Sequence, residues 1–233
     1  MDTILQCDGL CKCYSNGTMA LNHLTLELPK GQIIGLLGPN GSGKTTLIKL
    51  AAGLLTPTFG KITIDGMPVG VDTKAIVSYL PERTYLSPSM RVEECINLFT
   101  TFYPDFDRAR VMEMLQLLSV PINAKIKTLS KGTREKVQLV LVMARRAKLY
   151  LLDEPIAGVD PAARDYILDT ILKNYSEDST ILISTHLISD IEGVLDSFLF
   201  IRNGQVICQD KVSAVVEQRG QTLDQFFREV FRC

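Results

Sequence analysis

The stretch QIIGLLGPNGSGKTTLIKLAAGLL, residues 32–55, decides the fold, because it joins an apolar strand to a helix through a glycine-rich turn. Residues 38–45 fit the pattern G-x-x-x-x-G-K-[ST], and the strand before and helix after are the context in which this pattern forms a phosphate-binding loop. Such a loop turns its backbone N–H groups toward phosphate oxygens, and the helix N-terminus adds partial positive charge. We predict that Lys44 neutralises the β- and γ-phosphates and that Thr45 offers its hydroxyl to Mg²⁺.

The alternative interpretation of this loop is a glycine-rich turn that merely links strand to helix, and it leaves Lys44 unexplained. We therefore favour a P-loop. The residues assigned to nucleotide binding in it are Gly38, Pro39, Asn40, Gly41, Ser42, Gly43, Lys44, Thr45 and Thr46.

Short apolar runs bounded by Gly and Pro recur along the chain and alternate with helical patterns. The runs are QIIGLLG, KITIDG, AIVSYLP, KLYLLDEP and TILISTH. This alternation predicts an α/β fold with a mainly parallel sheet covered by helices on both faces. Later, two apolar runs meet at Asn203-Gly204, a pair that suits the positive φ angles of a type I′ turn, so we expect the sheet to gain a hairpin there.

Two regions carry helical rather than strand patterns. Residues from about 83 to 135 are predicted as a helical subdomain inserted between strands, with Asp107 capping one of its helices. At the C-terminus, TLDQFFREVF has one apolar stripe, and Thr222 and Gln225 have capping-box spacing. Its mixed charges do not suit an anionic membrane surface, so packing on the protein's own body is favoured over a partner interface. We expect residues 1–233 to form one domain.

Acidic residues end the most apolar strand, KLYLLDEP, as Asp153 and Glu154. Ligands of open α/β sheets bind at the carboxyl ends of strands, so these acids are predicted to face the P-loop. Asp153 is then a candidate Mg²⁺ ligand and Glu154 the base that deprotonates an attacking water. A solvated sheet edge is the alternative, and the P-loop upstream argues against it. His186 also ends an apolar strand; a lone histidine is usually structural, but this position favours a γ-phosphate sensor.

Composition limits the possible partners and compartment. The chain has 25 basic and 26 acidic residues, evenly mixed, which gives no basic field for nucleic acid and no polybasic membrane arm. No apolar run approaches the ~20 residues of a membrane span, and the N-terminus lacks the pattern of a signal peptide, so we expect a cytosolic protein. The six cysteines are interpreted as reduced, small apolar side chains rather than a metal site.

The ordered set GPNGSGKTT, LSKGT immediately before LYLLDEP, AGVDP and STH resembles the ATP-binding cassette ATPases, the nucleotide-binding subunits of ABC transporters. The resemblance covers nearly the whole chain. It implies a P-loop NTPase core, an N-terminal antiparallel β subdomain and the inserted helical subdomain, with ATP and Mg²⁺ as cofactors. It also implies that Tyr14 stacks on adenine, although a single aromatic residue before a turn is no evidence by itself.

In this family two cassettes enclose two ATP molecules head to tail. The resemblance implies that LSKGT, through Ser130, Lys131 and Gly132, contacts the γ-phosphate bound to the partner's P-loop, and that Asp160 lies in a loop crossing the dimer interface. A hydroxyl and backbone amides at a helix start form an anion site, which agrees with this role.

The chain departs from the family pattern at two sites. The usual signature is L-S-G-G-Q, and here Lys131 and Thr133 replace a glycine and the glutamine. We expect ATP-driven pairing to be retained, with Lys131 adding positive charge near the γ-phosphate. The loop SYLPER has Glu82 where the family usually has glutamine. A carboxylate can still bind Mg²⁺ but cannot donate a hydrogen bond to water, so Glu82 is predicted as a variant metal ligand.

The expected function is ATP hydrolysis that closes and reopens a cassette dimer and drives separate integral membrane permease subunits, most similar to exporters. The protein would lie at the cytoplasmic face of the membrane, held there by the permease. The loop after Glu82 and the helices from about Val92 to Tyr103 would form the docking groove, with Phe99, Phe102 and Tyr103 lining it or serving as core residues. The alternatives are a soluble ABC ATPase acting on ribosomes or DNA, and a regulatory cassette with low activity.

Overall fold

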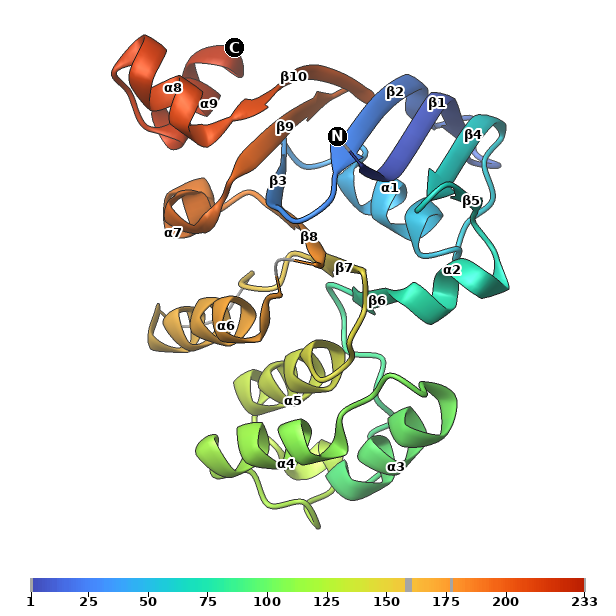
Figure 1. The fold of residues 1–233 in the computed structure, drawn as a ribbon, viewed down its shortest axis with the longest axis vertical. Coiled ribbons are helices and arrows are strands. Elements are labelled where there is room, and N and C mark those ends of the chain that lie inside the picture. The colour runs from blue at the N-terminus through green and yellow to red at the C-terminus, as the bar shows by residue number, and fades with distance from the viewer. Residues whose placement is uncertain (1, 158–160, 177, 233) are drawn as a thin grey trace.

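The computed structural model describes residues 2–157, 161–176 and 178–232, and its strands form two sheets (Figure 1). The smaller sheet is antiparallel and has the strand order β2-β1-β4-β5. Its strands are β1 (Thr3–Cys13), β2 (Met19–Pro29), β4 (Phe59–Ile64) and β5 (Met67–Pro68). The run KITIDG therefore belongs to this sheet and not to the parallel one. The physical reason is that buried and more exposed side chains alternate along this strand, as in an antiparallel sheet with one covered face. Ile62 and Ile64 are buried, whereas Lys61 is exposed.

The larger sheet has the order β10-β9-β3-β8-β7-β6. Its strands are β3 (Ile33–Leu37), β6 (Val77–Leu80), β7 (Leu149–Asp153), β8 (Thr180–Thr185), β9 (Ser197–Arg202) and β10 (Gln205–Lys211). All neighbours pair in parallel except β10, which pairs antiparallel with β9. The turn between them has φ 50° at Asn203 and 73° at Gly204, so the predicted hairpin is confirmed. The mainly parallel α/β fold is confirmed as well.

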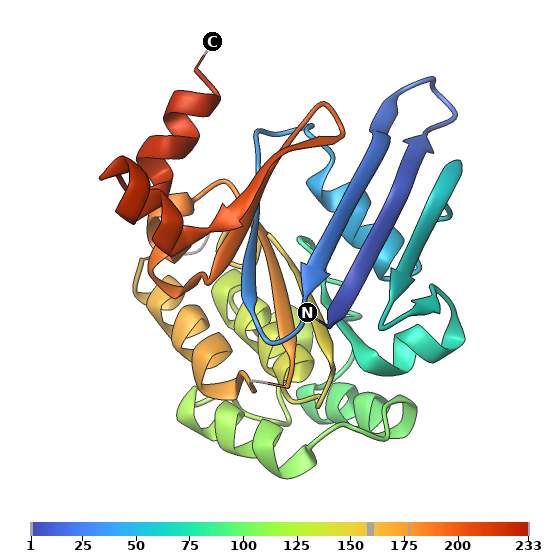
Figure 2. The same cartoon turned by 45° about the horizontal axis from the view of Figure 1, so that its top comes forward.

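The helices cover both faces of the larger sheet. They are α1 (Lys44–Ala51), α2 (Val71–Ile76), α3 (Val92–Phe102), α4 (Arg108–Leu117), α5 (Lys131–Met143), α6 (Pro161–Asn174), α7 (Ile188–Ile191), α8 (Val212–Arg219) and α9 (Leu223–Val230), with short 3₁₀ turns at Ile126–Thr128 and Glu192–Val194. Helices α3, α4 and α5 lie between β6 and β7 in the chain and gather at the end of the molecule farthest from the antiparallel sheet (Figures 1 and 2). The Asp107 carboxylate accepts from the Arg110 amide, which confirms the predicted cap of α4.

The core has two parts, one on each face of the larger sheet. Helix α1 lies between the two sheets, because Leu47 and Ile48 share a buried cluster with Leu24 of the smaller sheet and Leu182 of the larger one. On the opposite face, α3 to α7 and the C-terminal helices pack together. No helix in the described part of the chain combines the length and the apolar character that a membrane span requires.

The C-terminal helix packs on the protein's own body, as predicted. Thr222 and Gln225 form its capping box, and Leu223 and Phe226 are buried. The Phe226 ring lies 5.4 Å from the Phe200 ring of β9, between ring centroids. This aromatic packing fixes α9 against the antiparallel edge of the larger sheet.

Strand register brings the carboxyl ends of three strands together. Asp153 at the end of β7 is the register partner of Ser184 on β8, and Thr185 on β8 is the partner of Leu37 on β3. Because β3 leads directly into the glycine-rich loop, this edge of the sheet brings the loop, the two acids and His186 to one place.

Candidate active site

The glycine-rich loop adopts a conformation that side chains would block. Gly43 has φ 112°, and a Cβ there would lie 2.6 Å from the Ala20 carbonyl oxygen. A Cβ on Gly38 would lie 2.3 Å from the Ile201 carbonyl oxygen. Both distances are well below van der Waals contact, so the loop passes close to β2 and β9 only because these positions are glycines.

Lys44 is buried inside this loop. Its Nζ donates to the carbonyl oxygens of Gly38, at 2.7 Å, and Pro39, at 3.2 Å. Burial lowers the pKa of this ammonium group, while the nearby Glu154 and Asp153 carboxylates act in the opposite direction. The ammonium therefore lies among loop carbonyls, where phosphate oxygens could replace its present acceptors.

Asp153 is almost completely buried, at 1% exposure. Its Oδ1 accepts hydrogen bonds from Ser184 Oγ at 2.7 Å and Thr45 Oγ1 at 3.1 Å. Its Oδ2 is buried and has no hydrogen-bond partner among the described residues. Burial raises the pKa of this carboxyl, and the Glu82 charge raises it further, while the hydroxyls of Ser184 and Thr45 oppose the shift. An orphaned carboxylate oxygen beside a threonine hydroxyl is the oxygen donor set that a hard divalent cation such as Mg²⁺ prefers.

Glu154 has a strained backbone with φ 51°, which non-glycine residues rarely adopt. Its amide donates to the Ser184 carbonyl oxygen at 3.0 Å, which holds the chain in this turn. Its Oε2 lies 3.0 Å from His186 Nδ1. Strain of this kind is characteristic of functional sites, because it persists only where surrounding contacts fix it. The structure thus brings together Lys44, Thr45, Asp153, Glu154 and His186.

A cavity of about 360 Å³ opens beside these residues. Glu82 lines it and is exposed, and the adenine candidate Tyr14 lies near it, with its hydroxyl 3.2 Å from Thr46 Oγ1. The other lining residues are Thr18, Met19, Ala20, Asn40, Gly41, Gly43, Lys44, Thr45, Thr46, Glu154, Ala157 and His186. Pro39 and Ser42 belong to the same loop, with Ser42 buried beneath it.

The signature turn is not part of this cavity. Ser130 caps α5, and its Oγ accepts from the Thr133 amide at 3.1 Å and lies 2.8 Å from Thr133 Oγ1. Lys131 is exposed, and its Nζ lies 3.8 Å from Glu135 Oε1, one helical turn along. Neither these residues nor Gly132 lines the cavity of their own chain. Asp160 lies outside the described residues.

Three supporting residues have no motif that would have identified them. Ser184 holds both acids, through the Asp153 side chain and the Glu154 backbone. Gln138 of α5 is buried and accepts from the Tyr85 amide at 3.0 Å, which holds the loop that follows Glu82. Arg145 donates to the Asp105 carboxylate and to the carbonyls of strand β6 and helix α2. The only available signal was the position of Ser184 at a strand end.

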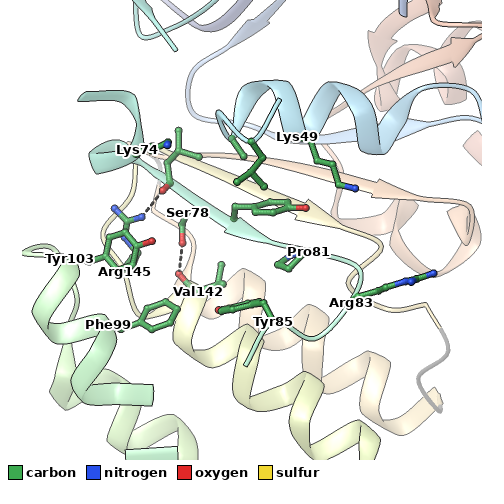
Figure 3. Close-up of a pocket in the computed structure, with 14 residues that line it drawn as sticks. Lys49, Lys74, Ser78, Pro81, Arg83, Tyr85, Phe99, Tyr103, Val142 and Arg145 are labelled. Atoms are coloured by element: carbon green, nitrogen blue, oxygen red, sulfur yellow. Dashed lines mark hydrogen bonds between the residues drawn. The ribbon is translucent and has the colours of Figure 1, made fainter. Parts of the chain in front are cut away.

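A second cavity, of about 530 Å³, lies between α1, α2 and the helices α3 and α5 (Figure 3). Phe99 and Tyr103, two of the three aromatic residues named for the predicted docking groove, line it. Phe102, the third, is 68% exposed and does not line the cavity. The physical reason is helical periodicity: Phe99 and Tyr103 are four residues apart on one face of α3, and Phe102 projects elsewhere.

Comparisons with known proteins agree with this geometry. Residues 21–157 match the family model described as ABC transporter. The chain is 31% identical over 210 residues to the SkfA peptide export ATP-binding protein SkfE of Bacillus subtilis (strain 168), across 88% of this chain and 87% of that protein. It is 30% identical over 227 residues to the Nod factor export ATP-binding protein I of Cupriavidus pinatubonensis, across 94% of this chain and 70% of that protein.

Solved structures show the same fold. An ATP-binding subunit of an ABC transporter superposes with a TM-score of 0.88 at 29% identity, over 99% of this chain and 100% of that chain. An ATP-binding cassette solved as a dimer in a post-hydrolysis state with ADP and Pi superposes with a TM-score of 0.79 at 22% identity, over 89% and 98% of the two chains. The chain therefore belongs to the family of ABC transporter ATP-binding subunits, which are ATPases.

Proposed function

We propose that this ATPase binds ATP with Mg²⁺ on its own P-loop, pairs head to tail with a second cassette, and uses hydrolysis to drive a membrane permease. The observation that carries the proposal is the set of contacts around Asp153 and Glu154. One acid offers an orphaned buried oxygen beside Thr45, and the other contacts His186 beside Lys44. A regulatory cassette with low activity would not require these contacts.

The residues of this chain would act as follows. Lys44 would exchange its loop carbonyls for the β- and γ-phosphate oxygens, and the loop amides would bind the same phosphates. Glu154 would accept a proton from the attacking water, and His186 would hold the Glu154 carboxylate in position and contact the γ-phosphate. Tyr14 would stack on the adenine ring.

The donor set fits Mg²⁺, and Thr45, Asp153 and Glu82 would hold it. Bound Mg²⁺ would neutralise charge on the β- and γ-phosphate oxygens. Glu82 replaces a neutral amide, so it would strengthen cation binding and repel the γ-phosphate. A Glu82→Gln protein with unchanged Mg²⁺ dependence and turnover would remove Glu82 from this set.

The signature turn would complete the site of a partner molecule. Ser130 and Gly132 lie at the N-terminus of α5, away from the cavity of their own chain. We propose that they contact the γ-phosphate on the partner's P-loop, with Lys131 adding charge, and that Asp160 lies in the same dimer interface. The family relationship supports this arrangement, since a related cassette has been solved as a dimer.

The permease would bind at the second cavity, beside Phe99 and Tyr103, and would hold the chain at the cytoplasmic face of the membrane. Residues from about 83 to 135 would form the helical subdomain, which supplies one side of this groove, within a single domain of residues 1–233. The names of two relatives refer to export, of the SkfA peptide and of Nod factor, and we propose an exporter on that ground. Co-purification with a polytopic membrane protein would support this, and a stable association with ribosomes or DNA instead would contradict it.

The catalytic assignment is tested by Glu154→Gln. The amide keeps the size and the contact to His186 but cannot act as a base, so we expect ATP turnover to fall by about 10²–10⁴. ATP binding and ATP-dependent dimerisation should remain. The matched control is Glu217→Gln, the same change at an exposed position of α8, which should leave turnover unaltered. Equal activity of the Glu154→Gln protein and the unmodified protein would disprove the assignment.

A further inference from the structure

A buried serine hydroxyl lies between the two acids of the site. Ser184 is fully buried near the end of β8, and residues 181–183 before it are buried and apolar. Removing a hydroxyl from water is unfavourable unless it is hydrogen-bonded, and alanine or valine would fill such a position without that cost. The hydroxyl of Ser184 is therefore explained by its bonding partners and not by packing.

This hydroxyl connects the candidate cation ligand to the candidate base. Its Oγ donates to Asp153 Oδ1 at 2.7 Å and accepts from the Glu154 amide at 3.1 Å. The same amide also donates to the Ser184 carbonyl oxygen at 3.0 Å, so two oxygens of one residue hold it. A chain of hydrogen bonds thus runs from the Glu154 N–H through the Ser184 O–H to the Asp153 carboxylate, and each bond polarises the next.

Each of the two bonds restricts one feature of the site. Thr45 also donates to Asp153 Oδ1, but its hydroxyl would turn to the cation in the arrangement that we propose, whereas Ser184 can keep its bond. The bond to Oδ1 leaves Oδ2 as the oxygen that a cation can reach. The bond to the Glu154 amide supports a backbone with φ 51°, an unfavourable conformation that sets the direction in which the side chain leaves the strand.

We propose that Ser184 is a positioning residue for ATP hydrolysis. Through its hydroxyl it aims Asp153 Oδ2 at the cation and Glu154 at the attacking water, and it does not itself line the nucleotide cavity. This inference rests on the proposed function, in which these acids hold Mg²⁺ and act as base, and it adds the residue that orients both. Replacing a residue that orients a metal ligand from outside typically costs about 10- to 100-fold in metal affinity or activity.

The test compares three substitutions at Ser184 in the full-length chain. Ser184→Ala removes the hydroxyl and adds no atoms, Ser184→Thr keeps a hydroxyl, and Ser184→Val has the shape of threonine without it. We expect kcat to fall by about 10- to 100-fold in the Ala and Val proteins and to stay within about 3-fold in the Thr protein. The KM for ATP should change by less than about 3-fold in all of them, because the P-loop contacts remain.

Cation binding gives a readout that does not depend on turnover. Mn²⁺, a paramagnetic substitute for Mg²⁺, is titrated into each protein with bound ADP and followed by EPR. It should bind about 10-fold more weakly to the Ala and Val proteins than to the Thr and unmodified proteins. Thr180→Val is the matched control, because Thr180 is a fully buried hydroxyl at the other end of β8 and accepts from the Gly31 amide. It should lower stability and leave kcat and Mn²⁺ affinity unchanged.

The outcomes separate this inference from the proposed function. Equal kcat of the Thr and Val proteins, or an equal loss with Thr180→Val, would overturn the inference and leave the proposed function standing. A fall in kcat with unchanged Mn²⁺ affinity would overturn the part that concerns Asp153. Failure of the proposed function would instead appear as unaltered turnover of Glu154→Gln, or unaltered Mn²⁺ binding by Asp153→Asn, whatever the Ser184 variants do.

Discussion

At the scale of single residues, the site is held in a state that costs stability. Asp153 is a buried carboxylate with an orphaned oxygen, and Glu154 occupies a strained backbone conformation beside it. Ser184 satisfies part of both residues and leaves the Asp153 Oδ2 free for a ligand. The fold thus positions charge for the nucleotide, and for the cation that we propose, before they bind, which is electrostatic preorganisation.

Replacing Asp153 by Asn should make the protein more stable and inactive. The amide oxygen can still accept from Thr45 and Ser184, but the cost of burying the carboxylate charge is gone. We expect the free energy of unfolding at pH 7 without nucleotide to rise by about 0.5–2 kcal/mol, the range of ordinary stabilising substitutions. Mg²⁺-dependent ATP turnover should be lost. Chemical denaturation and an ATPase assay measure the two effects.

The pH dependence of this stabilisation has a definite sign. Burial raises the Asp153 pKa in the folded state above the usual value of 3.8. A carboxyl with a raised folded pKa costs stability as the pH rises from its unfolded pKa through its folded pKa. The advantage of Asp153→Asn should therefore vanish near pH 4 and grow as the pH increases. An advantage that stays constant from pH 4 to 8 would show that the charge of Asp153 is not the cause.

At the scale of secondary-structure elements, the sequence predicts what neighbouring residues determine. The P-loop, the Asp107 cap and the Asn203-Gly204 turn depend on residues a few positions apart, and each appears as predicted in position and conformation. The strand β4 was assigned to the wrong sheet, because a short apolar run does not reveal its pairing partners.

The contacts that the sequence did not predict are long-range. Gln138 bonds to Tyr85 across 53 residues and Arg145 to Asp105 across 40, and only the tertiary fold brings such pairs together. Gln138 lies in α5, the helix that begins at the signature turn, and Arg145 follows the end of that helix. Through them, α5 contacts the loop after Glu82 and the floor of the second cavity. A movement of α5 in a dimer would therefore reach the groove where we propose that the permease binds.

Among these residues, Arg145 should hold helix α3 in place most strongly. Its side chain is 2% exposed, and its guanidinium lies 3.9 Å from the centroid of the Tyr103 ring and donates to several acceptors. Arg145→Lys keeps the charge but loses the planar donor set. We expect the free energy of unfolding to fall by roughly 1–3 kcal/mol, with faster amide exchange in α3.

Arg146→Lys is the matched control for this prediction. Arg146 is adjacent in sequence, but its side chain is 74% exposed and forms one ion pair with Asp107. We expect a change within about 0.5 kcal/mol, as for most surface substitutions. Equal destabilisation by the two variants would mean that the buried network of Arg145 does not hold α3.

At the scale of the whole molecule, the proposed head-to-tail dimer would use two separate parts of the chain. Its P-loop, Asp153 and Glu154 line one cavity, whereas Ser130 and Gly132 lie at the start of α5, outside it. The N-terminus of a helix favours an anion, and in the proposed dimer the γ-phosphate bound to the partner would lie there. Lys131 is unfavourable for α5 itself, because a cation in the first turn opposes the helix dipole. Head-to-tail pairing accounts for both features.

Lys131 and Glu135 should therefore set the strength of ATP-driven pairing. Their 3.8 Å contact holds Lys131 along its own helix, and a γ-phosphate on the partner would compete for it. In a Glu154→Gln background, which prevents hydrolysis, Lys131→Gln should weaken ATP-dependent dimerisation by about 2- to 5-fold. Glu135→Gln should release Lys131 and strengthen dimerisation by a similar factor. Sedimentation velocity with ATP, at low and high salt, measures these changes.

The double variant separates this explanation from a general effect on α5. If Glu135 acts only by holding Lys131, then Glu135→Gln should have no effect once Lys131 is replaced by Gln. Both single effects should also shrink at high salt, since they are electrostatic. Tighter dimerisation of Lys131→Gln or Lys131→Gly would show that the added charge opposes pairing. In that case the positive charge of Lys131 would reduce the affinity of the two cassettes for each other. Glu135 would then be the residue that limits this effect by pairing with Lys131.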